Sequence, residues 1–253
     1  MAFCLLLVLP VQPFLLLIGG RPAEYVPYWF FWISNRIIGA KIVIHGVPSR
    51  NDPVLHVANH ISWLDIFVLG GILRSSFVAR ADLAEWRLFG WLSKLRRTIF
   101  IDRENRARSS AHLEQMIERL AKGDGLILFP EGTSSDGGRV LPFKSSLFAV
   151  AERWTGDKPL TVQPVSLAYT RINNMPLGRH FRPYVCWIGD MELGPHLWDF
   201  LKMGRVTAVV SFHEPVTLEQ IEGRKAMSAY CHAKIAQELE RQNAGLDDAA
   251  RAA

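Results

Sequence analysis

After Ala40, short apolar runs rich in β-branched residues alternate with longer helical stretches, and this alternation most strongly limits what the chain can fold into. Strands that alternate with helices build an α/β sheet whose faces the helices cover. We therefore expect one α/β domain over residues 41–253, with a mixed, mainly parallel central sheet flanked by helices. The expected strands cover residues 41–45, 54–58, 77–79, 98–101, 126–129, 160–169, 184–188 and 206–212.

Helices are predicted where apolar residues recur every three or four positions. The clearest one covers residues 105–122 and stops at Gly123, because glycine suits the end of a helix. A second helix is expected over residues 218–242. The apolar stripe of the first helix consists of Leu113, Met116, Ile117 and Leu120.

The first 20 residues contain no charged side chain, and their apolar run approaches the roughly 20 residues that cross a bilayer core. Pro10 and Pro13 would kink or split a helix there, so a spanning and a half-inserted segment are both open. A cleaved secretory signal is a third option, although no Lys or Arg precedes the apolar run and no A-x-A-like cleavage site follows it. A buried hairpin of a soluble fold is the remaining alternative. We expect residues 1–40 to form an N-terminal membrane-associated helical segment.

Aromatic residues gather between Tyr25 and Trp32, in the pattern typical of the lipid headgroup layer. Arg36 and Lys41 follow, and positive charge on this side places the rest of the chain at the cytoplasmic face, which is the inner membrane in a bacterium. The chain carries 29 Lys and Arg against 24 Asp and Glu, a formal charge of +5 that favours anionic partners such as membrane lipids. Three widely spaced cysteines exclude a disulfide framework and a multi-cysteine metal site.

The sharpest local feature is a polar pair at the end of an apolar strand, in the run Asn59-His60-Ile61-Ser62-Trp63-Leu64-Asp65. Strand ends next to helix starts are where α/β sheets place ligands. If His60 lies in the turn and Asp65 in the first helical turn, the carboxylate can accept the imidazole N–H and fix its tautomer. His60 is therefore the candidate general base, and Asp65 is its partner.

The same run also allows a capping role and a metal-binding role. Ser62 and Asp65 fit a capping box, in which the carboxylate only satisfies a backbone N–H. His56 and His60 are four residues apart, but on a strand this spacing separates them by roughly 13 Å, which is too far for one zinc ion. We expect no bound metal.

A second feature is the Gly-rich turn over residues 129–138, directly after a predicted strand. Such a turn exposes backbone N–H groups that can cradle an oxyanion or a phosphate. Glu131 would repel a phosphate, so we expect it to accept a hydrogen bond from a substrate hydroxyl or to hold an arginine. Taken alone, a turn of this composition is more often a plain turn without a ligand.

Three further residues are candidates. Arg103 follows the strand that ends in Ile101 and Asp102, and its guanidinium has the shape to hold a phosphate, although surface arginines are common there. Lys144 is a weaker cationic candidate at a helix start, and Pro164 inside an apolar strand indicates a sheet edge or a bulge. The sequence has no nucleophile elbow, P-loop or dinucleotide fingerprint, so its chemistry must use His60 without an obvious covalent nucleophile.

Taken in order, four blocks resemble those of the glycerolipid acyltransferases of the lysophosphatidate acyltransferase family. They are N-H-x4-D at Asn59 to Asp65, F-I-D-R at Phe100 to Arg103, F-P-E-G-T-S at Phe129 to Ser134 and V-x-P-V at Val162 to Val165. The resemblance implies a membrane-bound enzyme that moves a fatty acyl chain from acyl-CoA or acyl carrier protein to the free hydroxyl of a lysolipid, typically 1-acyl-glycerol-3-phosphate giving phosphatidate. A thioester is already activated, so direct attack needs only a base, an oxyanion donor and positioning, and we expect no bound cofactor.

The resemblance also implies roles for single residues. His60 would be the general base with Asp65 as its partner, Arg103 would bind phosphate, and the acceptor site would include Glu131, Gly132 and Thr133. Lys144 stays a candidate substrate ligand.

Phosphatidate synthesis is not the only function that fits this sequence. The stretches at residues 143–148, 189–191 and 195–198 look like the bacterial subgroup that includes lyso-ornithine lipid acyltransferases, whose acceptor has an amino-acid headgroup in place of a phosphate. That acceptor would leave Arg103 without its phosphate. A non-catalytic protein that binds anionic lipids at a membrane surface is a possibility from a different class. Nucleic acid is not an expected partner in any of these cases.

Overall fold

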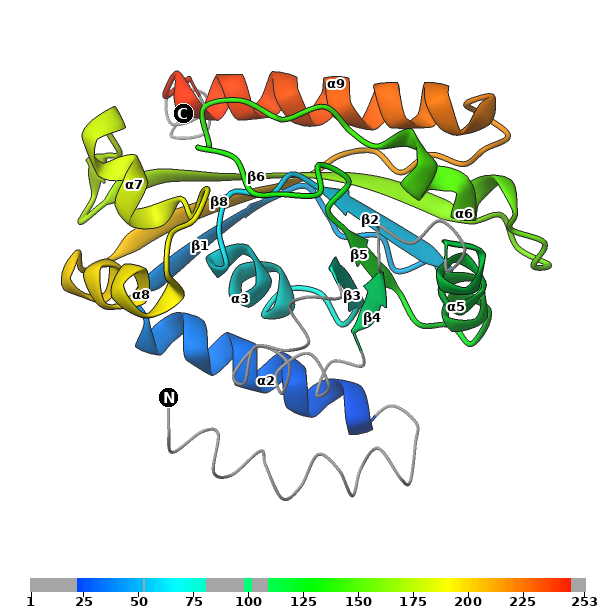
Figure 1. The fold of residues 1–253 in the computed structure, drawn as a ribbon, viewed down its shortest axis with the longest axis horizontal. Helices are drawn as coiled ribbons and strands as arrows, with labels where there is room; N and C mark the ends of the chain where they lie inside the picture. The colour runs from blue at the N-terminus through cyan, green and yellow to red at the C-terminus, as the bar shows by residue number, and fades with distance from the viewer. Residues whose placement is uncertain (1–21, 52, 81–97, 102–108, 247–253) are drawn as a thin grey trace.

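The computed structural model describes residues 22–51, 53–80, 98–101 and 109–246, and it has an α/β fold with a mostly parallel central sheet flanked by helices, as predicted (Figure 1). Within these residues the sheet has eight strands in the order β1-β8-β6-β2-β5-β3-β4, with β7 paired to β6. β8 and β7 run antiparallel to β6, and the other described pairs are parallel. The strands are β1 (Ala40–His45), β2 (Val54–Ala58), β3 (Ser76–Arg80), β4 (Ile99–Ile101), β5 (Leu126–Leu128), β6 (Thr161–Ile172), β7 (Met175–Pro176) and β8 (Val206–Phe212).

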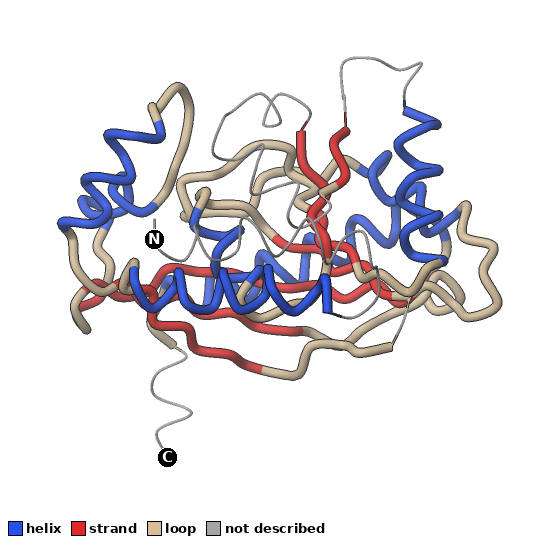
Figure 2. Tube along the Cα trace, turned by 90° about the horizontal axis from the view of Figure 1, so that it is seen from below, coloured by secondary structure: helices blue, strands red, loops and turns tan. Residues whose placement is uncertain are grey.

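Helices cover both faces of the sheet. The long helix α9 lies along one face, over β6, whereas α3 and α2 lie on the opposite face (Figure 1). Helix α5 and the pair α7 and α8 lie at opposite ends of the molecule (Figure 2). The helices are α2 (Pro22–Ile37), α3 (Leu64–Gly70), α5 (Ser109–Ala121), η3 (Ser145–Phe148), α6 (Ala149–Glu152), η4 (Arg179–Phe181), α7 (Arg182–Val185), α8 (Leu193–Lys202) and α9 (Gly223–Asn243).

The centre of the sheet is covered on both faces. β2, β5 and β8 are buried along their whole length. Strands of this kind read as continuous apolar runs rather than alternating ones, because neither face meets water. This burial explains why unbroken apolar runs predicted these strands correctly.

Two predicted elements differ from the structure. No strand covers residues 184–188, which instead contain the end of α7 and an extended segment. Pro183 explains the error, because it has no N–H for a strand ladder and suits the first turn of a helix. The predicted helix from Leu218 begins only at Gly223, because Gln220 and Ile221 first donate to the Thr217 carbonyl in a turn, at 3.1 and 3.2 Å.

The expectation of a sheet edge or a bulge at Pro164 is wrong on both counts. β6 lies between β2 and β8 inside the sheet, and its register shift against β8 falls between Tyr169 and Arg171 rather than at Pro164. The Pro164 carbonyl accepts a hydrogen bond from the His213 N–H at 3.0 Å, just beyond the end of β8 at Phe212. In an extended residue the backbone nitrogen and the carbonyl point to the same side of the strand. The Pro164 nitrogen therefore also points toward His213, past the end of β8. A proline therefore fits an interior strand without removing a ladder hydrogen bond.

Helix α2 divides the predicted aromatic segment between the core and the surface. Phe30 and Phe31 are buried, and Phe31 packs edge-to-face on Phe67 of α3, with ring centroids 5.3 Å apart. Trp29 is 51% exposed. None of the helices in the described ranges is both long and apolar enough to cross a membrane, and the charge-free residues 1–20 lie outside those ranges.

Asn59 fastens the end of β2 to β6. Its side-chain amide donates to the Leu167 carbonyl at 2.9 Å and accepts from the Leu167 N–H at 2.8 Å, and the side chain is fully buried. Both backbone groups of Leu167 thus have partners where the ladder between the two strands stops. The clamp fixes the place where the chain leaves the sheet toward His60.

We expect Asn59→Ala to lower the free energy of unfolding by about 2–4 kcal/mol, because it leaves a buried N–H and a buried carbonyl unpaired. Urea denaturation of the purified protein measures this change. Asn51→Ala is the matched control, since Asn51 is exposed. Indistinguishable midpoints for the two variants would show that the clamp adds nothing to stability.

Candidate active site

His60 lies in the turn between β2 and α3, and the structure brings it together with Asp65. The imidazole Nδ1 is 2.7 Å from Asp65 Oδ2, and the imidazole ring stacks on Phe129 with centroids 4.4 Å apart. The His60 side chain is 18% exposed, and Nε2 makes no hydrogen bond to any described residue. One edge of the ring is therefore held in place while the other nitrogen is left for a reacting group.

Asp65 is fully buried at the start of α3 and satisfies several donors at once. Its Oδ2 also accepts the backbone N–H groups of Ile61 and Ser62, at 2.6 and 2.9 Å. Its Oδ1 accepts the Tyr169 hydroxyl at 2.7 Å. The capping interpretation is thus half correct, because Asp65 holds backbone N–H groups as well as His60, whereas the Ser62 hydroxyl has no partner among the residues that the structure describes.

Glu131 is buried behind the same turn. Its two oxygens accept the backbone N–H groups of His60 and Leu141, both at 2.7 Å. Burial raises the pKa of the Glu131 carboxyl to about 7, although these hydrogen bonds act in the opposite direction. Both oxygens are thus engaged by backbone, which favours a positioning role. Contact of Glu131 with a substrate hydroxyl or an arginine stays a prediction.

The Gly-rich turn uses most of its polar groups internally. Ser135 donates its N–H to the His60 carbonyl at 2.8 Å, and its hydroxyl accepts from the Gly137 N–H at 3.3 Å. Asp136 accepts from the Gly138 N–H at 2.8 Å. This part of the turn supports the backbone around His60 and does not present a free anion cradle.

The first part of the turn is different. Gly132 adopts a left-handed backbone with φ +83°, and Thr133 after it is exposed. The backbone N–H groups of Thr133 and Ser134 have no partner among the described residues, so they are the candidates for an oxyanion donor. Lys144 is exposed and ties its backbone N–H to the Pro130 carbonyl at 3.0 Å. The predicted phosphate ligand Arg103 lies outside the described residues.

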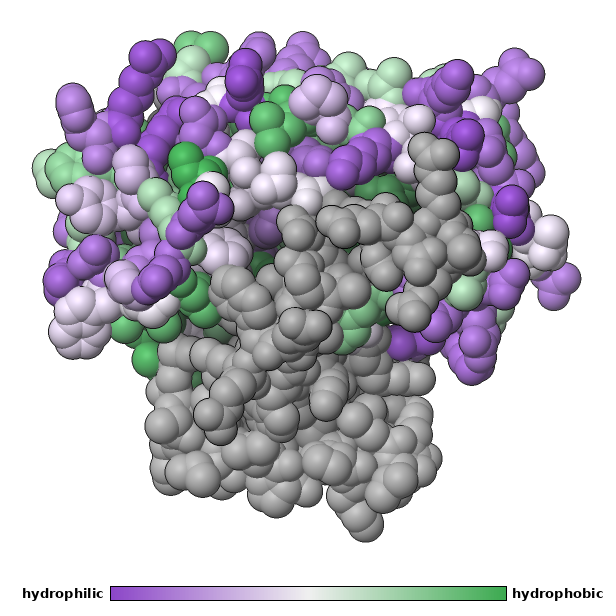
Figure 3. Space-filling model, viewed as in Figure 1, coloured by the Kyte–Doolittle hydropathy of each residue, from purple (hydrophilic) through white to green (hydrophobic). Residues whose placement is uncertain are grey.

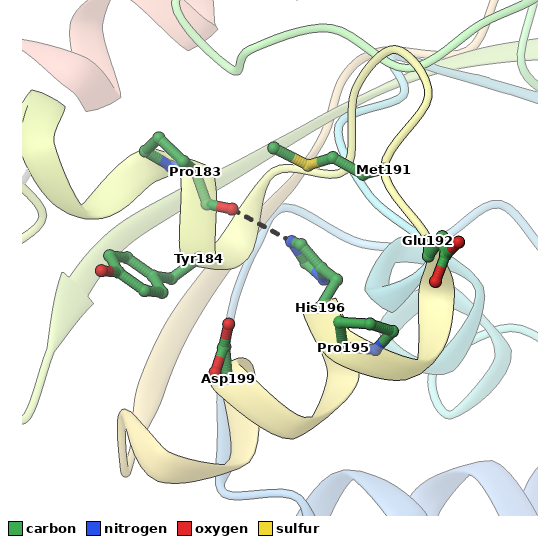
Figure 4. A pocket seen from close by; sticks show the side chains of 7 residues that line it. All are labelled: Pro183, Tyr184, Met191, Glu192, Pro195, His196 and Asp199. Atoms are coloured by element: carbon green, nitrogen blue, oxygen red, sulfur yellow. Dashed lines mark hydrogen bonds between the residues drawn. The ribbon is translucent and has the colours of Figure 1, made fainter.

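Helix α8 supports the motif from another side. The Trp63 indole donates to His196 Nδ1 at 3.0 Å, and His196 Nε2 donates to the Cys186 carbonyl at 3.0 Å. The same nitrogen donates to the Pro183 carbonyl at 3.1 Å (Figure 4). These bonds fit a neutral imidazole with its proton on Nε2. Beside it, between α7 and α8, is a pocket of about 300 Å³ that is not lined by His60. Its lining residues are Pro183, Tyr184, Met191, Glu192, Pro195, His196 and Asp199.

Within the described ranges, no group of three His, Cys, Asp or Glu side chains could hold a metal ion. His56 lies inside β2, and burial lowers its pKa to about 4, so it stays neutral near pH 7. Its ring packs near Phe212, with centroids 6.4 Å apart. His56 is a core residue that takes no part in the His60 site.

Sequence reasoning missed several residues that hold the site. Asn59 stands out in the sequence only as part of a motif, and no pattern predicts the roles of Tyr169 and His196. Tyr169 gives one sign, because a tyrosine in an otherwise apolar buried strand needs a partner for its hydroxyl. Its partner is 104 residues away in the chain, so spacing alone could not name it.

Comparison with known proteins decides the family. The family model described as Acyltransferase matches residues 41–168, which include His60, Asp65 and Glu131. A lyso-ornithine lipid O-acyltransferase of Brucella abortus is 40% identical over 223 residues, covering 87% of this chain and 84% of the relative. The chain belongs to the acyltransferase family.

Other relatives of this acyltransferase are similar over less of the chain or in fold alone. A 1-acyl-sn-glycerol-3-phosphate acyltransferase of Neisseria gonorrhoeae is 32% identical over 180 residues, covering 71% of this chain and 67% of the relative. The crystal structure of the 1-acyl-sn-glycerophosphate acyltransferase PlsC of Thermotoga maritima superposes with a TM-score of 0.60 at 21% identity. The superposition covers 93% of this chain and 86% of the PlsC chain, so this acyltransferase has the same fold.

We expect Glu131→Gln to lower kcat about 10- to 100-fold and to leave KM for the acceptor within about threefold. The amide can accept only one of the two backbone N–H groups, so the turn that carries His60 shifts. Steady-state kinetics over a range of acceptor concentrations measures both constants. Exposed Glu219→Gln is the matched control. A large rise in KM at an unchanged kcat would instead place Glu131 against the acceptor.

Glu131 also predicts a pH dependence of stability. A carboxyl whose folded pKa is raised stabilises the fold below its unfolded pKa of about 4.5, and this contribution is lost as the pH rises through about 7. The free energy of unfolding of wild type, minus that of Glu131→Gln, should therefore fall by on the order of 2–3 kcal/mol between pH 4.5 and 7. The opposite trend from His56 cancels in this difference. Urea denaturation at several pH values measures it, and a flat difference would contradict the raised pKa.

Proposed function

We propose that this acyltransferase moves a fatty acyl chain from an acyl thioester to the free hydroxyl of a lysolipid, with His60 as general base and Asp65 as its partner. The observation that carries the proposal is the 2.7 Å contact of His60 Nδ1 with a buried carboxylate, while Nε2 has no partner among the described residues. A general base needs a fixed tautomer and a nitrogen within reach of the hydroxyl. This arrangement supplies the first and leaves room for the second.

The reaction balances without a covalent enzyme intermediate. Nε2 takes the hydroxyl proton as the lipid oxygen attacks the thioester carbonyl carbon, and Asp65 stabilises the imidazolium that forms. The N–H groups of Thr133 and Ser134 are the candidate donors to the oxyanion. The tetrahedral intermediate then forms the ester and breaks the C–S bond, and the leaving thiolate receives the proton from His60. The donor is acyl-CoA or acyl carrier protein.

The acceptor we favour is a lyso-ornithine lipid. The Brucella abortus relative carries that name and shares 40% identity over 87% of the chain, against 32% over 71% for the Neisseria gonorrhoeae relative with a phosphate acceptor in its name. The stretches at residues 143–148, 189–191 and 195–198 favour the same subgroup. Lysophosphatidate, giving phosphatidate, is the second candidate, because the four blocks resemble that family as well. Either product would place the protein in membrane lipid biosynthesis.

The site is proposed to work at the cytoplasmic face of a membrane. Trp29, Ile33 and Ile37 are exposed and four residues apart on α2, so they form one outward apolar stripe. The guanidinium of Arg36 lies 4.0 Å from the ring centroid of Trp32, a pair that suits the headgroup layer. By contrast, hydrophilic residues predominate over α9 on the face shown in Figure 3, with hydrophobic ones scattered among them. These features support membrane association of the segment that precedes the sheet.

The decisive test compares His60→Ala with wild type on two acceptors, lyso-ornithine lipid and lysophosphatidate, using labelled acyl-CoA and labelled acyl carrier protein. We expect the variant to lose about 100- to 10,000-fold in rate, because proton removal is lost. We expect wild type to prefer lyso-ornithine lipid. Product formation is followed by thin-layer chromatography of the labelled lipid.

Exposed His180→Ala is the matched control and should keep the wild-type rate. A His60→Ala protein as active as this control would remove the general-base mechanism. Faster acylation of lysophosphatidate would make phosphatidate the product. Absence of acylation of both lipids by wild type would favour a non-catalytic lipid-binding protein.

A further inference from the structure

The Tyr169 hydroxyl reaches the His60 site from the sheet. Side chains alternate between the faces of a strand, and on β6 the Ser166 hydroxyl bonds the Ile235 carbonyl of α9 at 3.4 Å. Tyr169, three residues later, therefore faces the opposite side, where its hydroxyl donates to Asp65 Oδ1 at 2.7 Å. Tyr169 is only 5% exposed, so it is almost closed off from solvent. It contacts the partner of the base and not the base itself.

We propose that Tyr169 is a positioning residue for acyl transfer, and that its hydroxyl holds Asp65 Oδ1 so that Oδ2 stays on His60 Nδ1. This role rests on the proposed function, because it concerns the carboxylate that orients the general base. The class of interaction is a buried phenol–carboxylate hydrogen bond, which neither the four sequence blocks nor the names of the relatives assign.

The two oxygens of Asp65 are held very differently. Oδ2 accepts the N–H groups of Ile61 and Ser62 and faces His60 Nδ1, whereas in the described part of the chain Oδ1 accepts only the Tyr169 hydroxyl. A buried carboxylate oxygen without a donor is costly, so loss of the phenol favours rotation of the carboxylate or entry of water. Either change loosens the contact between Oδ2 and His60.

The sheet places Tyr169 with two local devices. Asn59 bonds the backbone of Leu167, which precedes Tyr169 by two residues and lies on the same face of β6. These two hydrogen bonds therefore fix both the end of β2 and the position of Tyr169 relative to it. Directly after Tyr169, the register of β6 against β8 shifts between Tyr169 and Arg171. Bulges of this kind re-aim side chains beside active sites. Burial and the charge of Asp65 raise the pKa of Tyr169 well above its usual value, so the hydroxyl stays a donor throughout the assay range.

The sign of the pH effect follows from the groups that face Asp65. These are His60 from the turn, Tyr169 from β6, Cys186 after α7, whose pKa burial raises to about 12, and Glu131 after β5. Without the phenol the contact between Asp65 Oδ2 and His60 Nδ1 loosens, so the carboxylate stabilises the imidazolium that forms in the reaction less strongly. The acid limb of kcat/KM should then move to lower pH.

The experiment replaces Tyr169 with Phe, which keeps the ring in the core and removes only the hydroxyl, and uses Tyr230→Phe on α9 as matched control. We expect Tyr169→Phe to lower kcat about tenfold with KM within about twofold, and to shift the acid limb to lower pH. Tyr230→Phe should match wild type in both. Adding Tyr169→Phe to Asp65→Asn should cost less than adding it to wild type, because both act on one interaction.

Three results would overturn the proposal. A Tyr169→Phe protein with the wild-type rate and pH profile, while His60→Ala is inactive, would remove the role of Tyr169 and leave the proposed function intact. A lower rate with an unshifted profile and an equal cost in the Asp65→Asn background would make Tyr169 merely structural. A fully active His60→Ala protein would remove the proposed function, and this role with it.

Discussion

The site depends on one fully buried carboxylate that accepts hydrogen bonds from two parts of the chain. Asp65 accepts backbone N–H groups from its own turn, faces the imidazole of His60, and accepts a phenol from the middle of the sheet. A buried anion is tolerated only when such donors surround it. The same contacts that make Asp65 acceptable in the interior also fix the ring of His60, so stability and chemistry share one set of hydrogen bonds.

Further hydrogen bonds hold the turn around this carboxylate in place. Asn59 joins the strand before the motif to the strand that carries Tyr169, and Glu131 joins the motif to the loop after β5. In both cases a buried side chain forms hydrogen bonds with backbone groups outside the strand pairing: Asn59 with Leu167, and Glu131 with His60 and Leu141. The turn with His60 is therefore held by neighbouring elements on several sides, although it is itself only a few residues long.

Local patterns in the sequence predicted the sheet and the pair at its centre. The contact between His60 and Asp65 followed from a short spacing at a strand end, and apolar runs located β2, β5 and β8. The sequence did not predict the supporting hydrogen bonds of Tyr169 and Glu131, because each joins residues far apart in the chain. Tyr169 is 104 residues from Asp65, and Glu131 is 71 residues from His60. The wrong strand at residues 184–188 arose because an apolar run fits a strand or a short helix equally well, and Pro183 decided for the helix.

The bond between Trp63 and His196 ties the motif of this chain to a distant segment. Trp63 lies inside the motif, whereas His196 belongs to α8, beyond the residues that the family model matches. A change of length or sequence near α8 that moves the His196 imidazole away from the Trp63 indole would disturb the turn that bears His60. Replacement of this segment by the corresponding segment of a relative, as in a chimeric enzyme, is thus constrained in this chain by a single indole N–H inside the motif.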